Sequence, residues 1–535
     1  MEKRNILAGS KLIKGALILS AAGLLGKILS ALYRVPYQNL TGDLGYYVYQ
    51  QIYPFYGAVM VISMYGFPVI ISKMMLEERL HRSKGEEIAA ASFILLSLFF
   101  LPLCILLWVA APFLAEWMGD EMLAFPLQLI SLSVLTVPFL ASLRGYGQGR
   151  GNMVPTAVSH LSEQVLRVAV ILIFAWITYM SQGTAYQAGT GAALGSVIGS
   201  AAGAVVLFFV TFKSHPISFT HLHWPSVFAS SRQIGKRLFV NGMLVSVGAM
   251  MFIIYQLVDA LMVIRMLQGA GITGEEAMVA KGVFDRGQPL LQFGTLAATA
   301  FSLAVIPYIS REVSRKNEKE ARIFGELAIR ISIIVGAAAA LGLWVIAESV
   351  NVMLFVNGHG TEVLRWLGLT LAVSGAAVTS AAVLQGRDHF YLPAIHLSIG
   401  IIVKISLNIL LIPAFTTIGA AAATVTGIGV TALLNIIFIY RKGYAVKIQA
   451  LHVVKGGAAL LFMLLFTWIL HSCLMTGGEG GRGVHTIAAV CSATGGGGIF
   501  LHLLLRWKVI STPESSYLPG MDRLEKILLV KERSA

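Results

Sequence analysis

The sequence has little charge and almost no cysteine. Only 12% of its 535 residues are charged, whereas 56% are hydrophobic, and the mean hydropathy is +0.77. A chain with so little charge does not have the surface of an ordinary soluble protein. Its three cysteines, Cys104, Cys473 and Cys491, all lie in apolar segments, so we infer neither a disulfide framework nor thiol chemistry. The composition predicts an all-α, polytopic membrane protein.

Acidic residues are also scarce, with 26 Asp and Glu against 40 Lys and Arg, which gives a formal net charge of +14. Such an excess could indicate a nucleic-acid partner. The cations, however, lie mainly in short loops between apolar segments, which is the positive-inside pattern of membrane proteins. We therefore expect a lipid bilayer around the chain and no nucleic acid.

Patterns typical of enzymes are missing as well. The glycine-rich stretch 145–149 precedes no strand-helix unit and lacks the Gly-Lys-Ser/Thr ending of a nucleotide-binding loop. His215, His221 and His223 lack the spacing of a zinc site. We find no pair of catalytic carboxylates and no nucleophile elbow. The sequence predicts no catalytic residue, no metal and no cofactor, and leaves open a coupling ion (H⁺ or Na⁺) or the membrane potential as the energy source.

Apolar stretches of about 20 residues predict about fourteen membrane spans. They cover residues 12–34, 47–72, 88–111, 122–143, 154–178, 186–212, 237–264, 282–310, 323–346, 362–384, 391–412, 416–440, 452–475 and 484–505. Most cations lie in alternate loops, and the intervening loops hold only Arg34, Arg265, Lys281 and Arg482. Both termini are therefore expected in the cytoplasm, with the basic start of the chain retained as part of the first helix and the tail segment 521–533 on the inner leaflet.

An internal repeat divides the chain. The triplet Gln148-Gly149-Arg150 returns 237 residues later as Gln385-Gly386-Arg387, and at the same offset Arg167 corresponds to Lys404. Two pseudo-symmetric six-helix lobes are expected, residues 1–225 and 226–447. Two further spans (448–510) and a cytoplasmic tail (511–535) follow them.

Cations inside predicted spans are functional candidates, because a charge at the membrane centre costs about 2.5–3.5 kcal/mol on insertion scales. Lys27 lies 13 residues beyond Lys14, hence about 20 Å along the helix. Lys404 has no acid one turn away. Arg286 could line a cavity or could simply pair with Asp285, and Arg34 could equally be an interface anchor. We select Lys27, Arg34, Arg286 and Lys404 as candidate substrate-binding residues.

Acids close to these cations form a second group of candidates. Asp259 could carry a coupling ion or hold the two lobes together through an ion pair. With Asp43 and Asp285 it forms our set of ion-coupling or charge-pair residues. Arg167 and Arg330 each follow a glutamate at i, i+4 spacing, Glu163 and Glu326, which predicts local neutralisation.

Several motifs resemble those of a known family. They are residues 49–54, residues 66–73, the stretch Phe284 to Leu291 and the second Gln-Gly-Arg triplet. Together they resemble the polysaccharide biosynthesis proteins of the multidrug/oligosaccharidyl-lipid/polysaccharide flippase superfamily. The branch in question contains stage V sporulation protein B and, more distantly, the lipid II flippases.

The resemblance implies two helical lobes arranged as a V around a central cavity, as in multidrug transporters of the superfamily. It also implies alternating access for an undecaprenyl-pyrophosphate-linked saccharide. Lys27, Arg34 and Asp43 match charged positions of the lipid II branch by type and approximate place. We expect a non-enzymatic, monomeric flippase in the bacterial cell membrane. Two alternatives stay open: a drug or cation antiporter of the same fold, and a non-transporting scaffold for envelope or spore-wall assembly.

Overall fold

The computed structural model describes residues 21–77, 82–214, 224–272, 274–389, 391–446, 449–476 and 480–509, with three isolated positions before residue 21. The chain start up to Lys14, the histidine trio at 215–223, and the tail 511–535 with its predicted segment 521–533 lie outside the described residues. Their predicted roles stay predictions.

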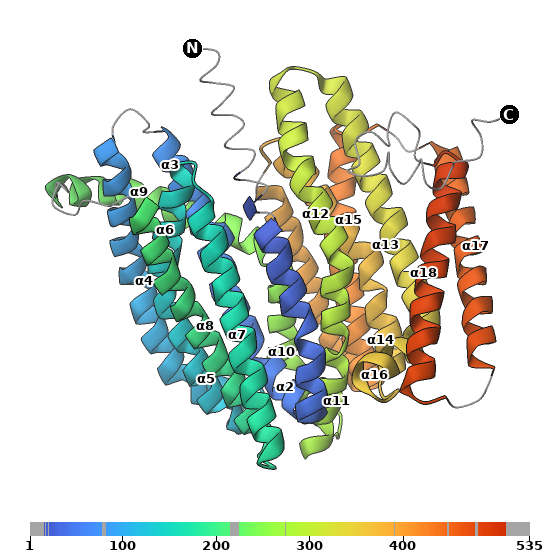
Figure 1. Cartoon of the computed structure of the whole chain (residues 1–535). Coiled ribbons are helices and arrows are strands. Elements are labelled where there is room, and N and C mark those ends of the chain that lie inside the picture. Colours follow the sequence, from blue (N-terminus) through green and yellow to red (C-terminus); the bar gives the residue numbers. More distant parts are fainter. Residues whose placement is uncertain are drawn as a thin grey trace. The chain divides into compact units, whose positions relative to one another are not determined.

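Most of the described residues are helical and none forms a strand, which confirms the all-α prediction (Figure 1). Among them, eleven helices are long and apolar enough to cross a membrane. Two of the eleven are too long for one crossing. Ala21–Glu77 has 57 residues and Tyr391–Arg441 has 51, hence about 85 and 75 Å at 1.5 Å per residue against a hydrocarbon core of about 30 Å.

Each of these two long helices contains a break in its backbone. Gly42 has φ +69° and Thr416 has φ 51°, both outside helical values. The second break falls at the first residue of the predicted span 416–440, just after the span 391–412, so that each part has the length of one crossing. The apolar pattern therefore predicts the crossings better than a count of continuous helices does.

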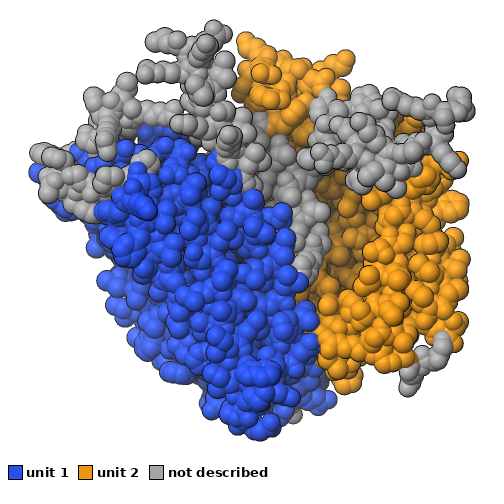
Figure 2. Space-filling model, viewed as in Figure 1, with its two compact units in different colours: residues 1–285, 407–420 blue, residues 286–406, 421–535 orange. Residues whose placement is uncertain are grey.

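The chain clusters into two compact units, residues 1–285 with 407–420, and residues 286–406 with 421–535 (Figure 2). This clustering does not test the predicted repeat boundary at residue 225, which stays a prediction. The first unit contains an unlabelled helix over residues 21–32 and then α2 (Arg34–Val61), the π-helix η1 (Ile62–Gly66), α3 (Phe67–Glu77), α4 (Arg82–Trp117), η2 (Glu121–Leu123), α5 (Ala124–Ser131), η3 (Leu132–Thr136), α6 (Val137–Gly149), α7 (Val154–Met180), α8 (Ala185–Ser214), α9 (Trp224–Ala249), α10 (Met251–Gly269) and α11 (Gly274–Asp285).

The second unit contains the remaining helices. They are α12 (Gly287–Ser314), α13 (Glu318–Phe355), α14 (Thr361–Gly368), α15 (Thr370–Gln385), most of α16 (Tyr391–Arg441), α17 (Ala450–Met475) and α18 (Arg482–Arg506). The last two helices pack beside α13 (Figure 1), where Ala338 meets a cluster that includes Met463 and Phe500. The two spans predicted to follow the repeat thus form one side of this unit.

Two predicted spans differ from the helices observed. The span 237–264 is divided at Met250 into α9 and α10, and the span 282–310 is divided at Arg286 into α11 and α12. The predicted loop position of Lys281 is wrong, because this residue lies in α11 and is only 1% exposed. Its ammonium is compensated locally, which a count of charges along the sequence does not reveal.

The Gln-Gly-Arg triplets occupy equivalent places in the two units. Arg150 follows the end of α6 and forms an ion pair with Glu86 of α4, with an N···O distance of 3.2 Å. Arg387 follows the end of α15 and forms an ion pair with Glu318 of α13 at 3.0 Å. Each guanidinium also lies over a tyrosine ring, Tyr146 and Tyr444 respectively. This correspondence supports the repeat inferred from the sequence.

Candidate functional site

Helix α2 begins at Arg34 and carries a row of tyrosines along one of its faces. Tyr46, Tyr49, Tyr53 and Tyr56 recur at spacings of three and four residues, which places them along one side of the helix. Arg34 is fully buried, and its guanidinium carbon lies 4.2 Å from the centre of the Tyr53 ring. Ring faces carry partial negative charge, so they stabilise a cation that has left water. The tyrosine rings of α2 thus stabilise the buried positive charge of Arg34 within a hydrophobic helix.

Two of the predicted acids lie near this arginine. Lys281 Nζ lies 2.5 Å from Asp285 Oδ2, one helical turn away in α11, and both residues are buried. Asp259 of α10 and Arg34 are close enough to Asp285 to act on its charge. We call Arg34, Asp259, Lys281 and Asp285 the charged cluster of the first unit. It brings together three residues selected from the sequence and one, Lys281, that the sequence analysis assigned to a loop.

Asp43 lies at the break in α2, immediately after Gly42. It is half-buried, and its Oδ1 accepts a hydrogen bond from Gln38 Nε2 at 2.9 Å. Helix α11 lies against this break, because a Cβ on Gly282 would come within 2.1 Å of the Asp43 carbonyl oxygen. The break therefore needs a glycine in the partner helix. Asp43 thus accepts a hydrogen bond at the break of α2, and its role in the site stays a prediction.

Lys27 differs from the other candidates because its side chain is exposed. It lies on the helix over residues 21–32, and in the described part of the chain its ammonium has no hydrogen bond and no ion pair. A lysine at this depth is costly if it faces hydrocarbon. Lys27 is therefore the predicted residue best placed to meet water or an anionic ligand.

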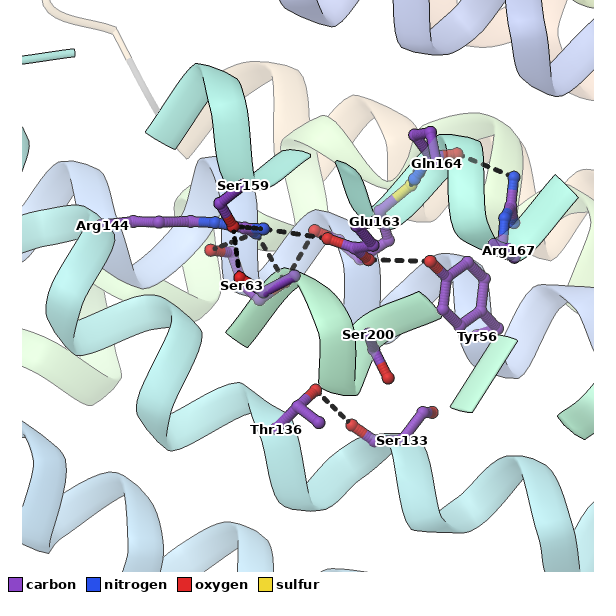
Figure 3. Close-up of polar contacts among 12 residues, drawn as sticks. Tyr56, Ser63, Ser133, Thr136, Arg144, Ser159, Glu163, Gln164, Arg167 and Ser200 are labelled. Carbon is purple, nitrogen blue, oxygen red and sulfur yellow. Dashed lines mark hydrogen bonds and ion pairs between the residues drawn. The ribbon is translucent and has the colours of Figure 1, made fainter. Parts of the chain in front are cut away.

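A buried network on α7 corrects the predicted pairing of Arg167 with Glu163. Glu163 Oε2 instead accepts a bond from Arg144 Nη2 at 2.9 Å, and Oε1 accepts one from the Tyr56 hydroxyl at 2.7 Å (Figure 3). Arg144 also donates to Ser63 and Ser159. Arg144 falls between the predicted spans 122–143 and 154–178, which predicts a loop position, yet it lies in α6 and is fully buried. The corresponding prediction for Arg330 is confirmed by an N···O distance of 2.9 Å to Glu326.

In the second unit, Arg286 occupies the junction between α11 and α12 and is 1% exposed. Its Nη1 donates to Asn357 Oδ1 at 2.8 Å and to the His359 carbonyl at 3.3 Å, which ties it to the α13–α14 connection. The Asp285 carboxylate bonds Lys281. Arg286 is thus held against the α13–α14 connection, and its role in substrate binding stays a prediction.

Lys404 lies on α16 and is fully buried. Its Nζ donates to Thr424 Oγ1 at 3.0 Å, a hydroxyl beyond the break of α16 at Thr416. Among the described residues no group of three or more His, Cys, Asp or Glu could hold a metal ion. Chemically, the site residues offer buried cations and carboxylates, which suit electrostatic binding.

Comparisons with known proteins agree with one another. The profile of the polysaccharide biosynthesis protein family matches residues 12–313. The uncharacterized membrane protein YabM of Bacillus subtilis (strain 168) is 36% identical over 97% of both chains. From the same organism, stage V sporulation protein B is 28% identical over 80% of this chain and 83% of its own. The lipid II flippase MurJ of this organism is 24% identical over 96% of this chain and 98% of its own.

Solved structures show the same fold. A lipid II flippase MurJ in an inward closed conformation superposes with a TM-score of 0.64 at 16% identity, covering 92% of this chain and all of that one. An inward-facing multidrug resistance MATE family transporter of the MOP superfamily gives a TM-score of 0.64 at 15% identity, covering 80% and 98%. The all-α, many-span architecture predicted from the sequence is thus the one these proteins have.

Proposed function

We propose a substrate for this chain, which belongs to the polysaccharide biosynthesis protein family and is a flippase or transporter of the MOP superfamily. The resemblance inferred from its motifs is confirmed. The proposed substrate is an undecaprenyl-pyrophosphate-linked saccharide, such as a cell-wall precursor. The chain moves this lipid across the cytoplasmic membrane by alternating access, without covalent chemistry and with both termini in the cytoplasm.

The observation that carries the proposal is the exposed Lys27 in the first span of a chain from this family. A diphosphate headgroup needs cations in water-filled surroundings, and lysine or arginine can donate directly to phosphate oxygens. Lys27 is the first contact in this proposal. Arg34, a few residues further along the chain, supplies a fixed positive field from its tyrosine surroundings.

The charged cluster has a different proposed role. Asp259 and Asp285 lie near Arg34 and Lys281, so the number of protons or cations that they hold changes the local charge. We propose that the cluster carries the coupling of substrate movement to an ion or to the membrane potential. Arg286 and Lys404 are assigned to support of the second unit around the transport path.

A multidrug or cation antiporter is the main alternative. Such a protein would be expected to use carboxylates and aromatic walls for cationic drugs, whereas the exposed charge in the first span is basic. A scaffold without transport is the second alternative. Proteoliposomes that contain a fluorescent undecaprenyl-pyrophosphate saccharide or a cationic dye distinguish all three.

The expected result is protein-dependent movement of the anionic lipid between leaflets, slowed strongly in Lys27→Ala. Movement of the dye alone would support the antiporter, and movement of neither would support the scaffold. In cells, depletion of the protein is expected to trap a lipid-linked saccharide on the inner leaflet. Mass spectrometry of that lipid then identifies the saccharide.

A further inference from the structure

Arg167 is a buried cation of the first unit that bonds to no carboxylate among the described residues. Arg167 of α7 is 0% exposed, and only its Nη2 has hydrogen-bond partners, Ser30 Oγ at 3.1 Å and Gln164 Oε1 at 2.8 Å. Within the described part of the chain, Nε and Nη1 donate to nothing. These two nitrogens carry three of the five N–H donors of a guanidinium.

The nearest acid along α7 is not available to Arg167. Both oxygens of Glu163 are engaged, one by Arg144 and the other by Tyr56 (Figure 3). The charges of Arg144 and Glu163 cancel, and Arg167 adds a positive charge beside them that no carboxylate of the described residues pairs with. Arg167 cannot become neutral by losing its proton, because the pKa of an arginine guanidinium is too high in any protein surroundings.

Aromatic rings cover the faces of the guanidinium. Its central carbon lies 4.7 Å from the centre of the Tyr56 ring and 5.4 Å from that of Tyr33. Rings stabilise a cation through its faces and leave its in-plane N–H groups to find acceptors elsewhere. Arg34 acts on the same tyrosines as Arg167, so two positive charges converge on one tyrosine cluster.

From this arrangement we propose that Arg167 binds a small inorganic anion inside the first unit, with chloride as the representative ligand. The anion accepts a hydrogen bond from Nη1 and neutralises the charge that Glu163 does not reach. Complete enclosure of Arg167 favours a small anion over a lipid headgroup with its sugar. The proposed anion site does not depend on the proposed substrate.

The test uses the full-length protein in lipid nanodiscs, with chloride replacing gluconate at constant ionic strength. We expect chloride to raise the Tm of the wild type, because a ligand that binds only the native state stabilises it. Arg167→Gln is expected to weaken chloride binding about 10- to 100-fold, the range for a lost hydrogen bond to a charged group. Arg330→Gln is the matched control, since Arg330 is equally buried but has Glu326 beside it, and it should keep the chloride effect.

Bromide-soaked crystals give a second and independent measurement. Anomalous scattering at the Arg167 guanidinium in the wild type, absent in Arg167→Lys and Arg167→Gln, supports the site even if one variant is unstable in solution. The proposal is overturned if chloride, bromide and nitrate leave the wild type unchanged, or if Arg167→Gln keeps the full chloride effect. It is also overturned if only a prenyl pyrophosphate, and no inorganic anion, acts through Arg167.

Discussion

Gly386 packs directly against Ile309: a Cβ at Gly386 would lie 2.9 Å from Ile309 Cβ and 3.1 Å from the Ile306 carbonyl oxygen. Gly149, the middle residue of the first triplet, has the same relationship with Met75, whose Cβ would be 2.9 Å away. In each unit the triplet therefore sets a close approach between two helices, α3 with α6 and α12 with α15. The glycine permits the contact, and the arginine after it adds the ion pair described above.

The first prediction concerns these two glycines. Gly386→Ala is expected to destabilise the protein by about 1–3 kcal/mol, the usual cost of overpacking. Gly149→Ala should cost less, because part of its clash is with the flexible end of Met75. Gly457→Ala is the control, since a Cβ there meets nothing within 4 Å and alanine favours a helix. Thermal unfolding in one detergent compares the three, and equal values would contradict the close-packing explanation.

The second prediction concerns the buried pair of Arg144 and Glu163. Glu163→Gln leaves the Arg144 charge uncompensated in a fully buried place, so we expect a loss of about 3–5 kcal/mol, as for other broken buried pairs. Replacing both residues by methionine should cost less than the single change, because no charge is left behind. A double-mutant cycle on unfolding free energies measures this difference. If the double variant were the least stable of the set, the pair would not be an electrostatic unit.

The sequence predicted the apolar helices well, because apolar length depends only on neighbours along the chain. It predicted the partners of charges less well. Spacing correctly predicted the pair of Arg330 and Glu326. It also paired Glu163 with Arg167, which is wrong. Glu163 bonds instead to Arg144, 19 residues away, and to Tyr56 of another helix. Such long-range competition for one carboxylate leaves no periodic signal. In the sequence, this network is indicated only by the hydroxyl-bearing residues Ser63, Ser159 and Tyr56 that line it.

The third prediction tests the orientation inferred from loop charge. In a variant with its three cysteines replaced, a single cysteine at Arg482 should react with a membrane-impermeant maleimide added to intact cells. A single cysteine at Ser534 should react only after the cells are opened. Arg482 is the first residue of α18, next to the loop expected outside, and basic loops are retained in the cytoplasm. The reverse pattern would place both termini outside and contradict the positive-inside assignment.

The fourth prediction separates support from transport at Arg286. Arg286→Ala removes the bonds to Asn357 and the His359 carbonyl in a buried place, so we expect a loss of stability of about 1.5–3 kcal/mol. Arg286→Lys should lose less stability than Arg286→Ala, since an ammonium can still donate to one of these oxygens. Thermal unfolding measures the effect. An unchanged Tm for the alanine variant would remove the structural role and make Arg286 a candidate for direct substrate contact.

The fifth prediction concerns Lys27, for which the opposite behaviour is expected. Its side chain is exposed and, in the described part of the chain, has no partner, so Lys27→Ala should leave the Tm unchanged. If it meets the diphosphate of the substrate, the same variant should slow movement of the lipid about tenfold or more, because a charge-assisted bond is worth at least about 1.5 kcal/mol. Lys27→Arg should restore most of the rate, since a cation is kept. Lys213→Ala, an exposed lysine at the end of α8, serves as the control for a general loss of positive charge. Full transport by Lys27→Ala would remove Lys27 from the proposed substrate site.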